Sequence, residues 1–227
     1  MRFRLAVEEM EVGRYVCWVL DLLGCYSASG EREAAVRCAP ERIAAHLEWL
    51  HRHDPSLPVI GALFETEVVE NFEAFPSVED PDYLVNAFFE DDLRPLTYWD
   101  CATGLQLLVW TREEFLGLVE KLSEEGLSAP IEGERRGTLA GIVEHVAGAE
   151  NWYFGHLGLS VDWAKLPRDP LVKLRVVREN TRTQIAKLID DARVVESFEE
   201  RWSARKILRR TLWHERAHTE QILRLTS

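Results

Sequence analysis

The feature that most constrains the fold of this chain is a change of hydrophobic pattern near residue 90. Before it, short segments rich in Val, Leu, Tyr and Trp are separated by Gly and Pro turn signals. After Arg94, long stretches carry apolar residues three and four positions apart. Alternation with a period of two is typical of strands, whereas the longer spacing is typical of amphipathic helices. The pattern therefore predicts two domains, an α+β domain over residues 1–90 and an all-α domain over residues 94–227.

In the first domain, strand-type segments flank one amphipathic segment. The strand-type segments are residues 3–9, 14–22, 63–75 and 83–89. The first two are joined across Val12-Gly13 and predict a β-hairpin. Residues 31–51 have helical spacing, and Pro40 is expected to kink or restart that helix because proline removes a helical hydrogen bond.

The second domain contains four amphipathic stretches, each long enough for a helix. They cover about residues 94–124, 138–157, 170–188 and 203–225. Thr138 is a good N-cap for the second stretch, and Asp169-Pro170 places a cap and a first-turn proline at the start of the third. Because the connections are short or moderate, the pattern predicts an antiparallel four-helix bundle.

Composition excludes several classes of protein. Hydrophobic residues at 46% and charged residues at 29% are typical of a soluble globular protein, and no apolar run approaches the roughly 20 residues that span a bilayer. No apolar signal-peptide core follows Met1, so we expect a cytoplasmic protein with no membrane partner. The four cysteines lack metal-binding spacing and are expected to be reduced core residues. A net charge of -12 argues against a nucleic-acid partner, although residues 201–210 are locally basic.

The last predicted helix contains the string His-Glu-x-x-His at residues 214–218. His214 and His218 are four positions apart, so both imidazoles project from one helix face and are close enough to share a metal ion. In zinc proteases the glutamate of this string is a general base, and the third ligand usually lies downstream. Residues 219–227 contain no His, Asp or Cys. A third ligand must therefore come from earlier in the chain, which points away from that protease class.

Two histidines of the second predicted helix are candidates for this third ligand. His214 and His218 lie on the core face of their own helix, and two buried imidazoles without partners are costly unless a metal satisfies both. His145 and His156 share one stripe of the second helix and are about 16 Å apart along its axis. Only one of them can meet the pair, and helix geometry alone leaves both open.

Three motifs resemble the DinB-like metal-binding four-helix bundle family. They are residues 138–147 followed by Trp152, residues 203–210, and residues 213–218. The resemblance covers about residues 94–227 and implies a divalent ion, zinc or nickel, bound by His145, His214 and His218. It thereby favours His145 over His156. Three neutral imidazoles leave an open coordination position, at which zinc binds and activates water or a thiol.

The resemblance implies a metal-dependent transferase or isomerase that uses a low-molecular-weight thiol and a small-molecule substrate. The alternative function is a non-catalytic metal-binding or stress-related interaction protein. A pocket at the metal faced by Arg210 favours the enzyme, whereas a metal covered by Trp152, Trp213 or residues 158–168 favours the alternative. A homodimer is compatible with either.

Three further residues are candidates for supporting the metal or binding substrate: Glu215, Arg210 and Trp152. Glu215 lies about 100° around the helix from His214, which favours a surface salt bridge over a role behind the metal or as a base. Arg210 is one turn before His214 and is either a receptor for an anionic group or a solvated cation. Arg112 occupies a core position of the first bundle helix, and we expect it to extend its charge to solvent.

Residues 1–60 resemble the small β-β-α-β domain of HicB-type antitoxins. The motifs are residues 15–25 and residues 29–34. Leu23 stands where that family commonly has a proline, and Pro40 interrupts the helix. The resemblance implies a recognition or oligomerisation module and carries over no catalytic residue.

Overall fold

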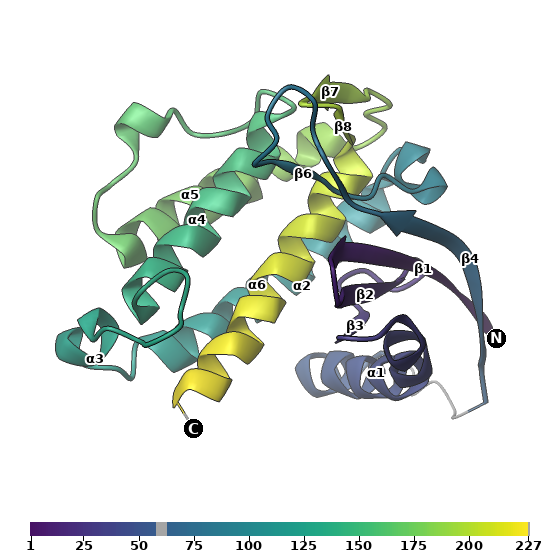
Figure 1. The fold of residues 1–227 in the computed structure, drawn as a ribbon, viewed down its shortest axis with the longest axis horizontal. Helices are drawn as coiled ribbons and strands as arrows, with labels where there is room; N and C mark the ends of the chain where they lie inside the picture. Colours follow the sequence, from purple (N-terminus) through teal and green to yellow (C-terminus); the bar gives the residue numbers. More distant parts are fainter. Residues whose placement is uncertain (58–62, 227) are drawn as a thin grey trace. The chain divides into compact units, whose positions relative to one another are not determined.

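The computed structural model describes residues 1–57 and 63–226 and has an α+β layout (Figure 1). The chain divides into two compact units. Unit 1 comprises residues 1–93 together with residues 196–201, and unit 2 comprises residues 94–195 together with residues 202–227. Each unit is described by itself below.

Unit 1 is built on a four-stranded sheet with the order β3-β2-β1-β4. Its strands are β1 (Arg2–Glu11), β2 (Arg14–Val19), β3 (Tyr26–Ser29) and β4 (Glu65–Glu73). Strands β1 and β2 form the predicted hairpin, and Gly13 in its turn has φ 73°, a conformation that glycine adopts without strain. Strand β4 is parallel to β1, so helix α1 (Arg32–His53) lies in the crossover before it.

The core of unit 1 lies between α1 and one face of the sheet. Leu5 and Val7 are two positions apart on β1, so their side chains point to the same face. They are buried with Ala35, Ala39 and Ile43, which recur every fourth residue along α1. Of the four cysteines, three are buried as expected, whereas Cys38 is exposed on α1.

The structure corrects two predictions for unit 1, the strand order and a restart of the helix at Pro40. The β-β-α-β order misses β3, which is too short, at four residues, to show a clear alternation. Helix α1 continues through Pro40. We attribute this continuity to Ala39 and Ile43, which are buried on both sides of the proline and hold the helix on the sheet.

The strand predicted over residues 83–89 is also much shorter in the structure. Only β6 (Leu84–Val85) forms, and it pairs with β5 (Phe75–Pro76). Pairing stops soon afterwards because the backbone N–H of Ala87 donates to the buried Glu8 carboxylate at 2.8 Å. Side-chain acceptors of this kind compete with a strand ladder and leave no periodic signal in the sequence.

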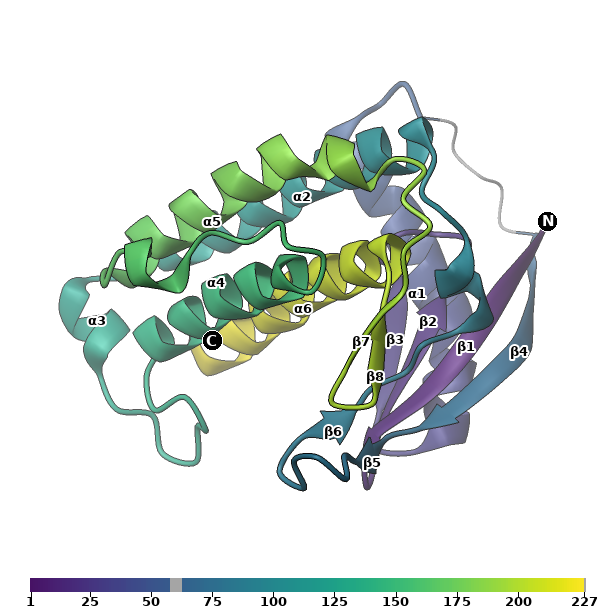
Figure 2. The ribbon, with the colours of Figure 1, turned by 90° about the horizontal axis from the view of Figure 1, so that it is seen from above.

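Four long helices make up most of unit 2 within residues 94–226. They are α2 (Tyr98–Val119), α4 (Leu139–Gly155), α5 (Pro170–Gln184) and α6 (Ala204–Thr226). Helix α4 packs against α5 and α6, and α2 packs against α6 (Figures 1 and 2). Its shorter elements are α3 (Glu124–Ser128) and the 3-10 turns η2 (Trp163–Lys165) and η3 (Ile185–Leu188). The 3-10 turn η1 (Glu90–Leu93) and most of the strands β7 (Val195–Ser197) and β8 (Glu200–Trp202) belong to unit 1.

The helix starts follow from their caps. Thr138 and Asp169 accept backbone hydrogen bonds at the starts of α4 and α5, as predicted. The first helix is shorter than the predicted 94–124, because a capping box between Thr97 and Asp100 begins α2 at residue 98 and a second cap begins the separate α3. The residue at which a helix begins sets which side chains share each face. This matters for α4 and α6, because these two helices carry the three histidines.

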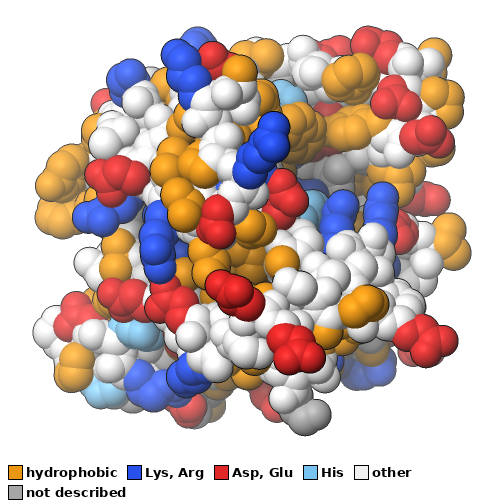
Figure 3. Space-filling view, turned by 90° about the vertical axis from the view of Figure 1, so that its left-hand side faces the viewer, with side chains coloured by type: hydrophobic (Ala, Val, Ile, Leu, Met, Phe, Trp, Pro, Cys, Tyr) orange, Lys and Arg blue, Asp and Glu red, His pale blue; other side chains and the backbone are white. Residues whose placement is uncertain are grey.

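The core of unit 2 draws on all four long helices. Its buried cluster contains Phe115, Val119, Leu139, Ile142, Val143, Val146, Ala147, Leu174 and Ile222. Among the described residues, no helix has both the length and the hydropathy needed to cross a membrane. On the face drawn in Figure 3, Lys and Arg side chains are interspersed with Asp and Glu side chains.

We expect residues 94–227 to fold without the rest of the chain. The buried cluster of unit 2 comes from residues 115–222, and that of unit 1 from residues 3–43, so neither cluster borrows side chains from the other. The expressed fragment should show helical circular dichroism and a cooperative thermal transition. A fragment without either property, beside a full chain that has both, would contradict the predicted independence.

Candidate metal centre

Three histidines of unit 2 converge between α4 and α6. The Nε2 atom of His214 lies 3.1 Å from Nε2 of His145 and 3.2 Å from Nε2 of His218. The candidate ligand atoms of all three lie within 4.8 Å of one another. His156 lies elsewhere and stacks on Trp202, with ring centroids 4.2 Å apart. The structure therefore brings His145 to the pair and leaves His156 apart from it.

The histidine cluster is buried on one side and open on the other. His214 is 8% exposed, whereas His145 and His218 are half-buried. Tyr153 and Trp213 lie beside His214, each with its ring centroid 5.9 Å from the imidazole. Parts of the His145 and His218 side chains are therefore accessible to solvent.

A hydrogen-bond chain fixes the tautomer of His218. Glu134 accepts a hydrogen bond from Nε2 of Gln221 at 2.7 Å, so the amide oxygen of Gln221 faces the histidine. This oxygen lies 2.5 Å from Nδ1 of His218 and can only accept. The proton of neutral His218 therefore sits on Nδ1, and its Nε2 presents a bare lone pair to the cluster.

His145 also presents a bare Nε2. Arg136 approaches this nitrogen with Nη2 at 3.1 Å, and a guanidinium can only donate. The cluster therefore has two acceptor nitrogens on either side of His214 Nε2. A single proton on His214 can satisfy at most one of them, so the other depends on a donor from outside the three histidines, as His145 does on Arg136.

The donor set fits a divalent metal ion. A cation accepts lone pairs from all three nitrogens at once, which protons cannot do here. The separations of 3.1 and 3.2 Å are close to about 3.3 Å, the edge of a tetrahedron whose metal–nitrogen bonds are about 2.0–2.1 Å. Neutral imidazole is a preferred ligand of zinc and nickel.

The electrostatics of the cluster keep His145 and His214 neutral. Burial, the neighbouring His218 and the cations Arg136 and Arg135 lower the pKa of His145 to about 3. Burial, His218 and His145 also lower the pKa of His214 well below its usual value. Neutral rings keep the lone pairs that metal binding requires, so a metal competes with few protons at neutral pH.

Replacing Gln221 by alanine should weaken metal binding by roughly 10–100-fold, the usual cost of losing a partner that orients a metal-bound histidine. The variant removes the acceptor that holds the Nδ1 proton of His218. Gln106→Ala is the matched control, because Gln106 is exposed on α2. Competition with a chromophoric chelator measures the affinity, and equal values for the two variants would contradict this role.

Glu215 is not in a surface salt bridge, so that expectation is wrong. Its buried carboxylate accepts hydrogen bonds from Thr111 at 2.6 Å and from Arg178 at 2.9 Å, and it pairs with Arg112. Arg112 and Arg178 also pair with Glu150 of α4 at 2.9 and 2.8 Å. Arg112 is therefore buried, where we expected its charge to reach solvent, because two carboxylates satisfy it in the core.

We call Arg112, Glu150, Arg178 and Glu215 the charge network. It joins α2, α4, α5 and α6, since each helix supplies one member. Burial alone would raise the pKa of Glu215, but the charges of Arg112 and Arg178 outweigh it and lower the pKa to about 2. Both carboxylates are therefore ionised at neutral pH, and the network balances two positive charges with two negative ones.

Of the other two candidates, Arg210 lies near the cluster. Arg210 is buried, and its guanidinium carbon lies 4.8 Å from the centroid of Trp213; its charge contributes to the lowered pKa of His214. Trp152 packs against His156 and Trp202, with centroids 4.5 and 5.1 Å away.

Much of the basic run over residues 201–210 is buried in the structure. Arg205 donates to the carbonyl oxygens of Arg94 and Pro95 and pairs with Asp100 at 3.1 Å. Lys206 lies 4.4 Å over the ring of Trp202. These contacts, rather than an exposed basic patch, account for the positive charges at Arg205 and Lys206.

Comparison with known proteins identifies the helical unit. Residues 105–222, slightly more than half of the chain, match the profile of the mycothiol-S-transferase family. That family lies within the DinB-like metal-binding helical superfamily, as the sequence motifs predicted. Nothing in the comparisons supports the HicB-type resemblance. No curated protein and no solved structure matches the chain.

Proposed function

Because the chain belongs to the mycothiol-S-transferase family, we propose that it joins the sulfur of a low-molecular-weight thiol to an electrophilic small molecule in a metal-dependent reaction. The convergence of three Nε2 atoms at one half-buried point, two of them held as hydrogen-bond acceptors, carries this proposal. Residues 94–227 are the scaffold, as an antiparallel four-helix bundle whose second and fourth helices supply the ligands. Zinc or nickel is the ion, and mycothiol is the first thiol to test.

Each histidine has a role that its contacts support. His145, His214 and His218 would hold the ion through Nε2, while Gln221 keeps the proton of His218 on the far nitrogen. A bound divalent ion lowers the pKa of a thiol held at the open position, so that the thiolate forms at neutral pH. In the transfer, the thiolate sulfur forms a bond to the electrophilic carbon, the leaving group departs with its electron pair, and the thiol proton goes to solvent.

Peptide hydrolysis is disfavoured by the position of Glu215. A protease-like reaction needs this glutamate as a base aimed at metal-bound water. Both of its carboxylate oxygens are engaged, by Arg112 on one side and by Thr111 and Arg178 on the other. Its lowered pKa makes it a weak base, and its burial keeps it from a water at the metal.

A panel of substrates tests the proposal. Mycothiol and other low-molecular-weight thiols are offered with electrophiles such as monobromobimane, beside casein and a generic ester, with His214→Ala as the blank. We expect metal-dependent loss of thiol with at least one electrophile and no proteolysis. Metal-dependent proteolysis that vanishes in Glu215→Gln would overturn the proposal. Metal binding without any turnover would favour the non-catalytic alternative.

The proposal also includes the cellular location of the protein and its oligomeric state. We place the activity in the cytoplasm, where low-molecular-weight thiols are kept reduced. The role of unit 1 as a recognition or oligomerisation module, and a homodimer of the chain, stay predictions. Size-exclusion chromatography with light scattering, on the full chain and on residues 94–227, tests both.

A further inference from the structure

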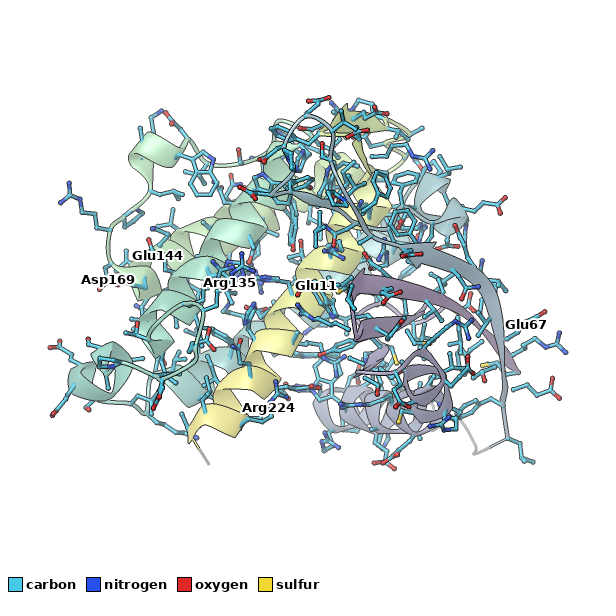
Figure 4. All side chains as sticks on the ribbon, in the orientation of Figure 1. Glu11, Glu67, Arg135, Glu144, Asp169 and Arg224 are labelled. Carbon is cyan, nitrogen blue, oxygen red and sulfur yellow. The ribbon has the colours of Figure 1, made fainter. Side chains whose placement is uncertain are left out.

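Two arginines whose side chains form no ion pair with any described residue lie beside the histidine cluster. Arg136 reaches Nε2 of His145, and the charges of Arg135 and Arg136 both lower the pKa of that imidazole. Within residues 1–57 and 63–226, neither arginine forms an ion pair with an aspartate or glutamate. Figure 4 shows the labelled Arg135 beside α4, on the side that faces α6. Two cations therefore lie beside the cluster in a protein of net charge -12, with Glu134 acting on Arg136 only at a distance and through its backbone N–H.

The backbone around Arg136 is anchored on both sides. Its N–H donates to a carboxylate oxygen of Glu134 at 3.0 Å, and the other oxygen of Glu134 binds Gln221. The carbonyl of Arg136 packs against Gly141 so closely that a Cβ there would lie 2.3 Å from the oxygen. Ile131 closes the loop by donating to the carbonyl of Gly137 at 2.8 Å. The loop that carries Arg136 is therefore held in place by hydrogen bonds. Through Glu134 it is connected to Gln221, the residue that contacts His218.

The guanidinium and a metal ion compete for the same lone pair of His145. An Nε2 atom has one lone pair, so metal binding at His145 ends its hydrogen bond with Arg136. The side chain is exposed and can turn away while its anchored backbone stays in place. Its guanidinium is then free for another acceptor, and its planar fork of N–H donors matches a carboxylate.

From this arrangement we infer that Arg136, assisted by Arg135, is an anion subsite that binds a carboxylate of one of the two reactants. The inference rests on the proposed function and specifies its substrate class. The carboxylate belongs either to the thiol or to the electrophilic acceptor. In both cases the arginine orients the reactant beside the metal and selects against uncharged analogues.

Binding measurements on the full-length protein loaded with cobalt(II) separate these sources. N-acetylcysteine and N-acetylcysteamine differ by one carboxylate, and the cobalt–thiolate absorption band reports the binding of each. Succinate, which has no sulfur, is titrated by calorimetry into the protein with and without N-acetylcysteamine. Arg136→Gln is compared with Arg168→Gln, a matched exposed arginine of unit 2, and circular dichroism checks that both fold.

In the wild type we expect a carboxylate to improve affinity about tenfold, as charge-assisted hydrogen bonds do. The gain should appear either as tighter binding of N-acetylcysteine than of N-acetylcysteamine, or as binding of succinate. Arg136→Gln should remove this gain, and Arg168→Gln should keep it. A gain between the two thiols assigns the carboxylate to the thiol, and a gain with succinate alone assigns it to the acceptor. A gain that survives in Arg136→Gln, or no gain in either arm, would overturn the subsite.

The same experiment separates the subsite from the proposed function. Succinate binding that depends on Arg136, with no cobalt–thiolate band from either thiol, would mean that the subsite is correct and that thiol activation is wrong. A band from both thiols without any carboxylate effect would mean the reverse.

Discussion

Replacing Glu150 by glutamine should lower the free energy of unfolding by about 3–5 kcal/mol, the usual cost of removing one partner from a buried ion pair. The Glu150 carboxylate accepts from Arg112 at 2.9 Å and from Arg178 at 2.8 and 2.9 Å, and all three side chains are buried. Without its charge, two buried guanidinium groups share the single carboxylate of Glu215. The desolvation of both cations is then incompletely compensated.

Glu144→Gln is the matched control for this prediction. Glu144 lies on the same helix and pairs with Lys173 at 2.5 Å, but it is exposed. An exposed ion pair is worth about 0–1 kcal/mol. Urea unfolding followed by circular dichroism measures both variants. A Glu150→Gln protein within about 1 kcal/mol of Glu144→Gln would mean that the charge network does not hold the four helices together.

Replacing His214 by alanine should reduce metal affinity by more than about 100-fold, which exceeds the loss expected for an outer partner. His214 is the most buried of the three histidines, and its Nε2 is the one within 3.2 Å of both others. Removing it leaves two imidazoles on different helices. The proposed transfer reaction should be lost with the metal, because no cation then lowers the pKa of the thiol.

His156→Ala controls for the loss of a histidine from the same unit. His156 follows α4 directly and stacks on Trp202, away from the cluster. We expect this variant to keep its metal while His214→Ala loses it, with helical circular dichroism retained in both. Equal metal affinity in the two variants, or a larger loss in His156→Ala, would mean that His214 is not a ligand.

The helices were predictable because their signals are local. The expected helix over residues 203–225 and the observed α6, Ala204–Thr226, agree within one residue. Ser203 marks the start, where its hydroxyl accepts from the Lys206 N–H, and an apolar stripe continues along the helix. The β7–β8 hairpin between α5 and α6 was missed. Its turn has positive φ at Phe198 and Glu199, 51° and 63°, where glycine or asparagine would have given a turn signal.

The histidine pair was predictable from spacing, whereas its third member was not. Helix geometry left His145 and His156 open, because the relative placement of two helices is a tertiary property. The family resemblance favoured His145, and the structure brings that residue to the pair. The ligand roles of all three histidines stay a proposal until metal is measured.

The charge network could not be predicted from the sequence of any one helix, because its members come from four helices. Glu215 was assigned to the surface because a charged residue on the flank of a helix is usually exposed. Its burial depends on arginines from two other helices, 103 and 37 positions away. One signal was available, since Arg112 stood at a core position where a lone cation is costly and implies a buried counter-charge.

Elemental analysis of the full chain purified without added metal tests the central claim most directly. We predict about one zinc or nickel ion per chain in the wild type, because a cation accepts the lone pairs of all three converging imidazole nitrogens at once. The protein with alanine at His145, His214 and His218 together should contain none. A wild type that neither carries nor takes up a divalent ion, or a triple variant with the same metal content as the wild type, would contradict the account.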